Sequence, residues 1–165
     1  MTAEQYNKLA AYFRADKRLM NILVYGNKIE TYLFYAVYPL LLVILAATSN
    51  AFLLKAFVVP AVCFIAVSVV RRLLNMPRPY EVLAIEPLIA KDTKGKSCPS
   101  RHVFSVYMIA MTWLYWCPVV GIILLLLGLD MIFLRVAGGV HFPKDVLIGA
   151  LVGVLCGIVG FWLIP

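Results

Sequence analysis

Residues 98–116 read CPSRHVFSVYMIAMTWLYW, a polar start followed by a largely apolar run that closes on aromatic side chains. His102, one of two histidines in the chain, lies where the polar start gives way to the apolar run. Apolar runs that end in Trp and Tyr are typical of membrane-spanning helices, because these rings prefer the membrane–water interface. The pattern predicts a span that begins at 99–102 and reaches Trp116.

The rest of the chain repeats this apolar character on both sides of that span. Of its 165 residues, 64% are hydrophobic and 14% are charged, which leaves too little polar surface for a water-soluble helical domain of this length. Further apolar runs long enough to cross a hydrocarbon core about 30 Å thick lie at 31–48, 51–70, 118–134 and 143–165. The composition predicts an all-α integral membrane helical bundle with about five transmembrane helices.

The N-terminal segment has a different pattern, in which apolar residues recur at helical spacing among basic ones. Its cationic side chains are Lys8, Arg14, Lys17 and Arg18. The pattern over residues 2–24 predicts an amphipathic helix at the membrane interface, which opens on a capping box at Thr2–Gln5. We expect one membrane domain over 1–165, with an interfacial amphipathic segment at 1–28 and a transmembrane bundle at 29–165.

Counting the crossings places three connecting segments at one face of the membrane. These are the N-terminal segment, the connection at 75–97 and the connection at 135–142. Both histidines, His102 and His141, therefore lie at that face. The 75–97 connection is rich in proline and lysine, which predicts a basic loop instead of a continuous helix.

Three separated pieces of the chain bring polar and basic residues to the same face. They are Arg71 followed after six residues by Arg78-Pro79, then Pro99-Ser100-Arg101-His102, then Arg135 followed after five residues by His141 and after three more by Asp145. Guanidinium groups neutralise the oxygens of a transferring phosphoryl group, and two histidines permit one nucleophile and one acid. The four-residue separation of His141 and Asp145 makes a hydrogen bond from the imidazole to the carboxylate sterically reasonable.

These pieces resemble, in order and in spacing, the signature motifs of the type 2 phosphatidic acid phosphatase superfamily, Lys-x6-Arg-Pro, Pro-Ser-Gly-His and Ser-Arg-x5-His-x3-Asp. The resemblance implies that His141 is the nucleophile that forms a phosphohistidine, that Asp145 is its partner, and that His102 is the acid for the leaving alcohol. It implies that the phosphate is held by Arg71, Arg78, Ser100 and Arg135. The family implies no metal and no other cofactor.

Three positions depart from those motifs. Arg71 replaces a lysine and keeps the charge, whereas Leu134 replaces a serine and removes a hydroxyl. Arg101 replaces a glycine and adds a guanidinium close to the site, so we include it among the phosphate-binding residues and expect it to influence the choice of headgroup. A further carboxylate, Asp130, lies inside an apolar run and is expected to pair with an arginine or another polar group of the bundle.

The residues and the resemblance together predict a metal-independent membrane phosphatase that hydrolyses a lipid phosphomonoester or diphosphate, such as phosphatidic acid, phosphatidylglycerol phosphate or an isoprenyl diphosphate. A lipid-to-lipid phosphotransferase would use the same site with a different acceptor. A non-enzymatic anion transport protein would also have a basic mouth, but it leaves the spaced motifs unexplained.

The net charge of +7 is compatible with nucleic acid or anionic lipid as a partner. No basic run with interleaved aromatic residues occurs outside the membrane-flanking segments, so we expect a lipid phosphate substrate and membrane lipids as partners and no nucleic acid. The oligomeric state is left open by the sequence.

The expected location is the cell membrane, which the chain crosses several times. All 15 Lys and Arg residues except Lys55 lie on the site face, so the positive-inside rule places that face in the cytoplasm. The family resemblance implies an extracytoplasmic site instead. We expect the family's orientation, because several arginines serve chemistry and an interfacial helix need not obey a rule that governs loops.

Overall fold

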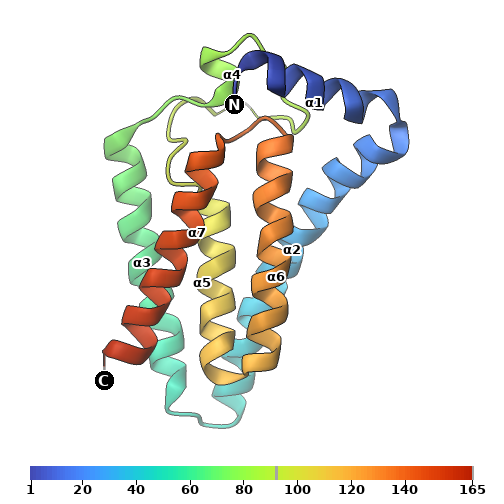
Figure 1. The fold of residues 1–165 in the computed structure, drawn as a ribbon. Helices are drawn as coiled ribbons and strands as arrows, with labels where there is room; N and C mark the ends of the chain where they lie inside the picture. The colour runs from blue at the N-terminus through green and yellow to red at the C-terminus, as the bar shows by residue number, and fades with distance from the viewer. Residues whose placement is uncertain (92, 165) are drawn as a thin grey trace.

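The computed structural model describes residues 1–91 and 93–164, and within these ranges the chain is helical with no strand. The helices are α1 (Ala3–Ala15), α2 (Lys17–Ala47), α3 (Phe52–Leu74), α4 (Pro79–Val82), α5 (Arg101–Trp116), α6 (Pro118–Ala137) and α7 (Pro143–Ile158), which continues as a π-helix over Val159–Leu163. Figure 1 shows α2, α3, α5, α6 and α7 side by side, with α1 across one end of the bundle. The expected all-α integral membrane bundle is confirmed.

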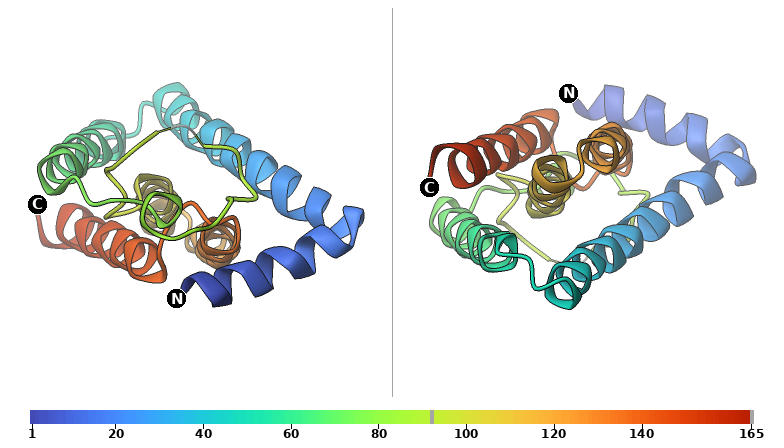
Figure 2. Two further views of the ribbon diagram at one scale, coloured as in Figure 1. Left: turned by 90° about the horizontal axis from the view of Figure 1, so that it is seen from above. Right: turned by 90° about the horizontal axis from the view of Figure 1, so that it is seen from below.

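Four of the helices, α2, α3, α6 and α7, are long and apolar enough to cross a membrane. Helix α5 is not among them, because its 16 residues reach only about 24 Å. Figure 2 shows α5 in the middle of the bundle, with the other long helices around it. The expected count of five spans is therefore approximate, since the central helix is shorter than its neighbours.

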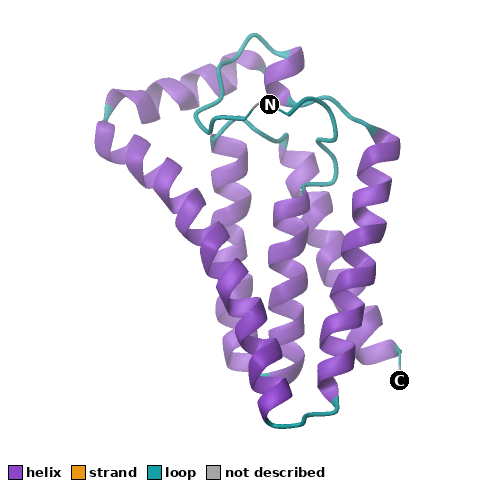
Figure 3. Ribbon diagram, turned by 180° about the vertical axis from the view of Figure 1, so that it is seen from behind, coloured by secondary structure: helices purple, strands orange, loops and turns teal. Residues whose placement is uncertain are grey.

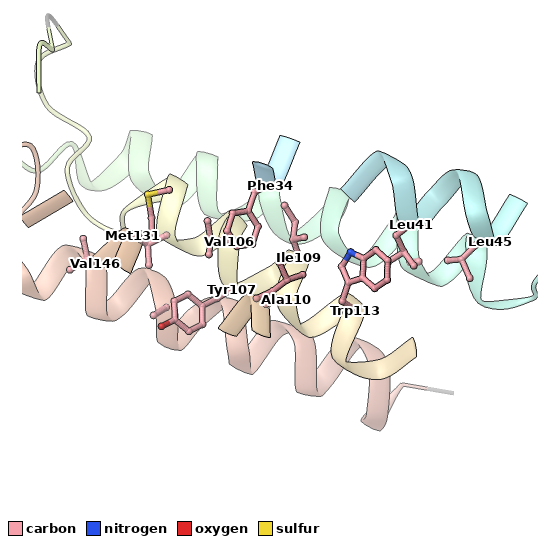
Figure 4. Packing of buried hydrophobic residues seen from close by; sticks show 14 residues of the cluster. Phe34, Leu41, Leu45, Val106, Tyr107, Ile109, Ala110, Trp113, Met131 and Val146 are labelled. Carbon is pink, nitrogen blue, oxygen red and sulfur yellow. The ribbon is translucent and has the colours of Figure 1, made fainter. Parts of the chain in front are cut away.

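Helix α5 is buried on almost every side. Ten of its residues are buried, among them Val103, Met108 and Trp113. The outer helices instead expose large apolar side chains, as Leu54 and Leu126 do, and such surfaces are suited to lipid. The core in Figure 4 packs Trp113 and Ile109 of α5 against α2, and the Trp113 indole donates to the carbonyl of Val37 at 3.2 Å.

The expected single helix over residues 2–24 is wrong, because the chain breaks after Ala15. Asp16 has an extended backbone, and its carboxylate accepts a hydrogen bond of 2.7 Å from the Arg18 N–H, so it caps the start of α2. The capping box at Thr2 and Gln5 is present at the start of α1, as expected. The apolar side of α1 packs on the protein itself, where Phe13 joins a cluster with Leu23 and Leu88.

The long connection from α3 to α5 closes the same end of the bundle as α1. Figure 3 shows its loops gathered above the ends of the helices. An ion pair of 2.7 Å between Arg14 and Glu86 joins α1 to this connection. The expected pairing of Asp130 is not found within the described residues, since its side chain is exposed on α6 and has no hydrogen bond or ion pair there.

Candidate active site

The two arginines of the first motif hold the basic loop in place. Arg71, in the last turn of α3, donates to the carbonyl of Lys96. Arg78, just before α4, donates through Nε to the carbonyl of Gly95 at 3.1 Å and through Nη1 to the carbonyl of Val140 at 3.0 Å. Both guanidinium groups are buried, so these bonds join the 93–97 loop to the α6–α7 connection.

His141 lies in the α6–α7 connection and is almost fully buried, with 2% of its surface exposed. Its Nε2 lies 3.5 Å from Nη1 of Arg78, while Nδ1 lies on the side of Asp145. The Nδ1 to Oδ2 distance is 3.9 Å, which is too long for the direct hydrogen bond that the sequence suggested. The two nitrogens of the ring therefore have different surroundings, a guanidinium on one side and a carboxylate on the other.

A serine that the sequence analysis missed lies between His141 and Asp145. The fully buried Ser97 donates its hydroxyl proton to Asp145 Oδ2 at 2.5 Å. The Ser97 Oγ also lies 3.4 Å from His141 Nδ1. Asp145 Oδ2 also accepts from the Phe142 N–H at 3.1 Å. Serines are too common to stand out in a sequence, and the role of Ser97 depends on contacts with residues more than 40 positions away, so the sequence carried no signal for it.

Close packing of α7 against the start of α5 brings the second and third motifs together. A Cβ atom on Gly149 would lie 2.7 Å from the carbonyl oxygen of Ser100. The glycine therefore allows the backbones to approach, and the Ser100 N–H donates to the carbonyl of Asp145 at 2.8 Å. Gly149 and Asp145 are one helical turn apart, so they share the face of α7 that packs on the start of α5.

Burial lowers the pKa of His141 to about 4, and the nearby charges of Arg78 and Arg135 act in the same direction. The nearby Asp145 carboxylate opposes this shift, because its negative charge favours the protonated ring. The imidazole is therefore neutral at physiological pH. A neutral ring with Nδ1 toward Ser97 and Asp145 has a free electron pair on Nε2, as nucleophilic attack requires.

Ser100 and Arg135 are buried beside these groups with unused hydrogen-bonding capacity. Within the part of the chain that the structure describes, Ser100 Oγ, Arg135 Nε and Asp145 Oδ1 have no hydrogen-bond partner. Buried polar atoms without partners call for an explanation, and an anion would satisfy the hydroxyl and the guanidinium. Leu134, by contrast, packs in the apolar cluster around Phe13 and not at the site.

A basic pocket of about 390 Å³ opens at this end of the bundle. It is lined by both histidines and by seven cationic side chains, Arg71, Arg72, Arg78, Lys91, Lys94, Lys96 and Arg101. Ser100, Arg135 and Asp145 are not part of its lining. The pocket thus unites most of the residues that the motifs singled out, with the other three buried near His141.

A second cavity connects this basic pocket to the membrane-facing side of the bundle. The neck, of about 160 Å³, shares Arg101 and His102 with the basic pocket. It shares Phe34, Tyr35 and Phe64 with an apolar groove of about 380 Å³ formed by α2, α3 and α5. The three cavities therefore adjoin one another, in order from polar to apolar surroundings.

Metal ligands do not cluster in the structure. Within residues 1–91 and 93–164, no group of three or more His, Cys, Asp or Glu side chains is placed to hold a metal ion.

Two solved structures share this fold over nearly the whole chain. The crystal structure of LpxE from Aquifex aeolicus has a TM-score of 0.74 and 24% identity, over 96% of this chain and 93% of that one. The crystal structure of the first transmembrane PAP2 type phosphatidylglycerolphosphate phosphatase, from Bacillus subtilis, has a TM-score of 0.60 and 22% identity, over 94% of this chain and 90% of that one. No protein with a curated description matches.

The model of one protein family matches residues 52–165, from the start of α3 to the end of the chain, and this range includes every position of the three motifs. That range is more than half of the 165 residues and includes Arg71, His102 and Asp145. Together with the bundle of membrane-spanning helices, the match assigns this multi-pass membrane protein to the PAP2 superfamily.

Proposed function

We propose that this protein is a membrane phosphatase that hydrolyses a lipid phosphomonoester or diphosphate through a phosphohistidine. The observation that carries the proposal is the continuity of the basic pocket, the neck and the apolar groove. Such a series suits a molecule with an anionic head and an apolar tail. The membrane phosphatase whose crystal structure resembles this chain adds support, since its described substrate is phosphatidylglycerolphosphate.

In the proposed reaction, Nε2 of His141 attacks the phosphorus and the bond to the leaving oxygen breaks. Arg78, whose Nη1 lies 3.5 Å from Nε2, is placed beside the phosphoryl oxygens, and Arg71 lines the same pocket. His102 lies at the neck, where the leaving group emerges, and gives it a proton. Water then attacks the phosphohistidine, with His102 taking a proton from it, and the P–N bond breaks to release phosphate.

The remaining motif residues support this chemistry. Asp145 and Ser97 orient the His141 ring. Ser100 and Arg135 supply the unpartnered donors near the transferring group, and Arg101 binds the headgroup at the neck. No step calls for a metal, because the cationic side chains neutralise the charge on the phosphoryl oxygens.

The test is phosphate release from a panel of lipid phosphates and diphosphates in detergent with a chelator present. The wild-type protein should release phosphate from at least one of them, and His141→Ala should lose at least about a thousandfold of that activity. Exposed Lys144, which does not line the pocket, provides a control as Lys144→Gln. Equal phosphate release by the wild type and His141→Ala would contradict the proposal.

Adding an unphosphorylated acceptor lipid to the same assay distinguishes hydrolysis from transfer. A hydrolase releases free phosphate at the same rate with or without the acceptor. A phosphotransferase instead yields a phosphorylated acceptor at the expense of free phosphate.

We also propose that the site lies on the extracytoplasmic face of the membrane. Seven of the 15 Lys and Arg residues line the basic pocket, so their position follows from anion binding and is a weak topology signal. A membrane-impermeant maleimide should label Lys94→Cys in intact cells and leave Ser49→Cys, in the α2–α3 connection at the other end, unlabelled. The reverse pattern would place the site in the cytoplasm.

A further inference from the structure

The basic pocket carries more positive charge than one transferring phosphoryl group accounts for. Arg78 lies 3.5 Å from His141, the buried Arg135 is close enough for its charge to act on the ring, and the buried Arg71 lines the same pocket. These three guanidiniums match the three oxygens of a phosphoryl group. Arg101 and Lys91 are therefore additional cations on the pocket wall.

Arg101 lies at the exit through which a leaving group must pass. It lines both the basic pocket and the neck, and its guanidinium carbon lies 5.4 Å above the ring centre of Phe64. Phe64 lines the neck and the apolar groove. Arg101 therefore marks the boundary between the transferring group and the tail.

Lys91 is half-buried in the 83–100 connection and lines the same pocket. Burial lowers its pKa, and the charges of Arg135, Arg78, Arg101 and Arg71 lower it further. A lysine surrounded by arginines is unfavourable unless an anion occupies the space between them. An anionic group within reach of Lys91 and Arg101 would relieve this repulsion.

We propose that the substrate is a lipid diphosphate, with its terminal phosphoryl group at His141 and its inner phosphate between Arg101 and Lys91. This assignment rests on the proposed phosphatase function and narrows it. Nε2 of His141 forms a bond to the terminal phosphorus, and the bond from that phosphorus to the bridging oxygen breaks. The electron pair stays on the bridging oxygen, so the leaving group is an anionic lipid monophosphate.

The charge of the leaving group explains why a cation lies at the neck. A phosphomonoester releases an alcohol, which needs a proton from His102 and is then neutral. A diphosphate releases a phosphate, whose oxygen is far less basic and keeps its negative charge. Arg101 at the neck and Lys91 on the wall of the adjoining basic pocket would stabilise the charge that develops on that group.

The experiment compares two pairs of substrates in detergent, farnesyl diphosphate with farnesyl monophosphate, and diacylglycerol diphosphate with phosphatidic acid. Within each pair the tail is constant and only the inner phosphate differs. The wild-type protein should have a kcat/KM at least about tenfold higher for the diphosphate of each pair, the size expected for one charged hydrogen bond.

Two variants should reduce this preference and one should not. Arg101→Gln and Lys91→Gln should each lower the ratio of the two kcat/KM values by about tenfold, since each removes a cation from the inner phosphate. Lys144→Gln removes a cation from the same face outside the pocket, so its ratio should equal that of the wild type. Because the ratio compares two substrates of one protein sample, a loss of folded protein lowers both kcat/KM values equally and leaves their ratio unchanged.

The results distinguish between the diphosphate assignment, the placement of the inner phosphate and the phosphatase function. A wild-type protein that hydrolyses the monophosphates as well as the diphosphates, or better, overturns the diphosphate assignment and leaves the phosphatase function intact. An unchanged ratio in both Arg101→Gln and Lys91→Gln overturns the placement of the inner phosphate. Phosphate release from no substrate, or release that His141→Ala does not reduce, contradicts the phosphatase function itself.

Discussion

Ser97 shows how an uncharged side chain organises a charged site. Its hydroxyl joins the carboxylate of Asp145 to the ring of His141 across a gap that those two do not bridge directly. With its proton donated to Asp145, the Ser97 oxygen accepts from the Nδ1–H of His141. This arrangement favours the tautomer in which Nε2 is free to attack.

Replacing Ser97 by alanine should lower kcat for phosphate release by about 10- to 100-fold, the effect of losing one hydrogen bond to a charged group. KM should change less, because Ser97 does not line the basic pocket. Thr112→Val is a matched control, since it also removes a buried hydroxyl but in the middle of α5. A fall in kcat of similar size in both variants would indicate a general loss of structure and contradict the prediction.

The protonation of His141 can be measured directly. Its pKa of about 4 lies below the ordinary 6.5 because burial disfavours the charged ring. The ring should therefore stay neutral as the pH falls from 8 to 5 and take up a proton only near pH 4. Nitrogen chemical shifts of labelled histidine in detergent, assigned with His141→Ala, report this titration, and a midpoint near 6.5 would refute it.

The sequence predicted which charged and titratable residues belong to the candidate site better than it predicted the contacts between them. The spacing singled out His141, Asp145 and the arginines because charged and titratable residues are rare in an apolar chain. It did not reveal Ser97 or the hydrogen bond of 3.0 Å from the Tyr6 hydroxyl to the His141 carbonyl. Both depend on how distant segments fold over the site, and neither residue type is unusual where it occurs.

At the scale of helices, the contact of α5 with α7 positions the second and third motifs. Glycines at intervals of four on α7 let the two backbones approach, and a Cβ atom on Gly153 would lie 2.9 Å from both the Phe104 carbonyl oxygen and the Tyr107 Cβ. These neighbours are rigid parts of α5. The close approach is therefore specific to glycine at this position.

Gly153→Ala should destabilise the protein by about 1–3 kcal/mol, because the added methyl group forces the two helices apart. Gly26→Ala on α2 is the matched control, since its Cβ would meet only Leu134 at 3.8 Å. That change should leave stability unchanged or slightly raise it through helix propensity. Thermal unfolding in one detergent compares the two variants, and equal midpoints would refute the prediction.

The sequence indicated this contact but not the lengths of the helices around it. Gly149, Gly153 and Gly157 recur every four residues, a spacing that favours a close neighbour but does not say which helix it is. The break at Asp16 was missed because basic and apolar residues continue on both sides of it. Helix α5 was expected as an ordinary span, since an apolar run looks alike whether it faces lipid or other helices.

At the scale of the whole molecule, three adjoining cavities lie between the basic end of the bundle and its lipid-facing side. The polar end is built by connections that are distant in sequence, and the apolar end by α2, α3 and α5. Sequence motifs predicted which charged and titratable residues lie at the polar end. They contained no information on the groove, because its lining is made of apolar residues that resemble those facing lipid.

Filling the groove should separate lipid substrates from small ones. Ala61→Trp places a large ring in the groove wall and should raise KM for a long-tailed lipid phosphate by about tenfold or more. Activity on a short soluble phosphate ester should change by less than about threefold, since it needs no groove. Val62→Trp, next to it but exposed, is the matched control. Equal effects on both substrates would contradict a role for the groove in tail binding.

The neck separates the two products of the proposed reaction. Free phosphate formed in the basic pocket dissolves in the aqueous phase, whereas the shortened lipid withdraws into the bilayer along the groove. The two products therefore partition into separate phases and dilute independently. Resynthesis would need phosphate to return from the aqueous phase and re-form the phosphohistidine, and the lipid to return separately along the groove to accept the phosphoryl group.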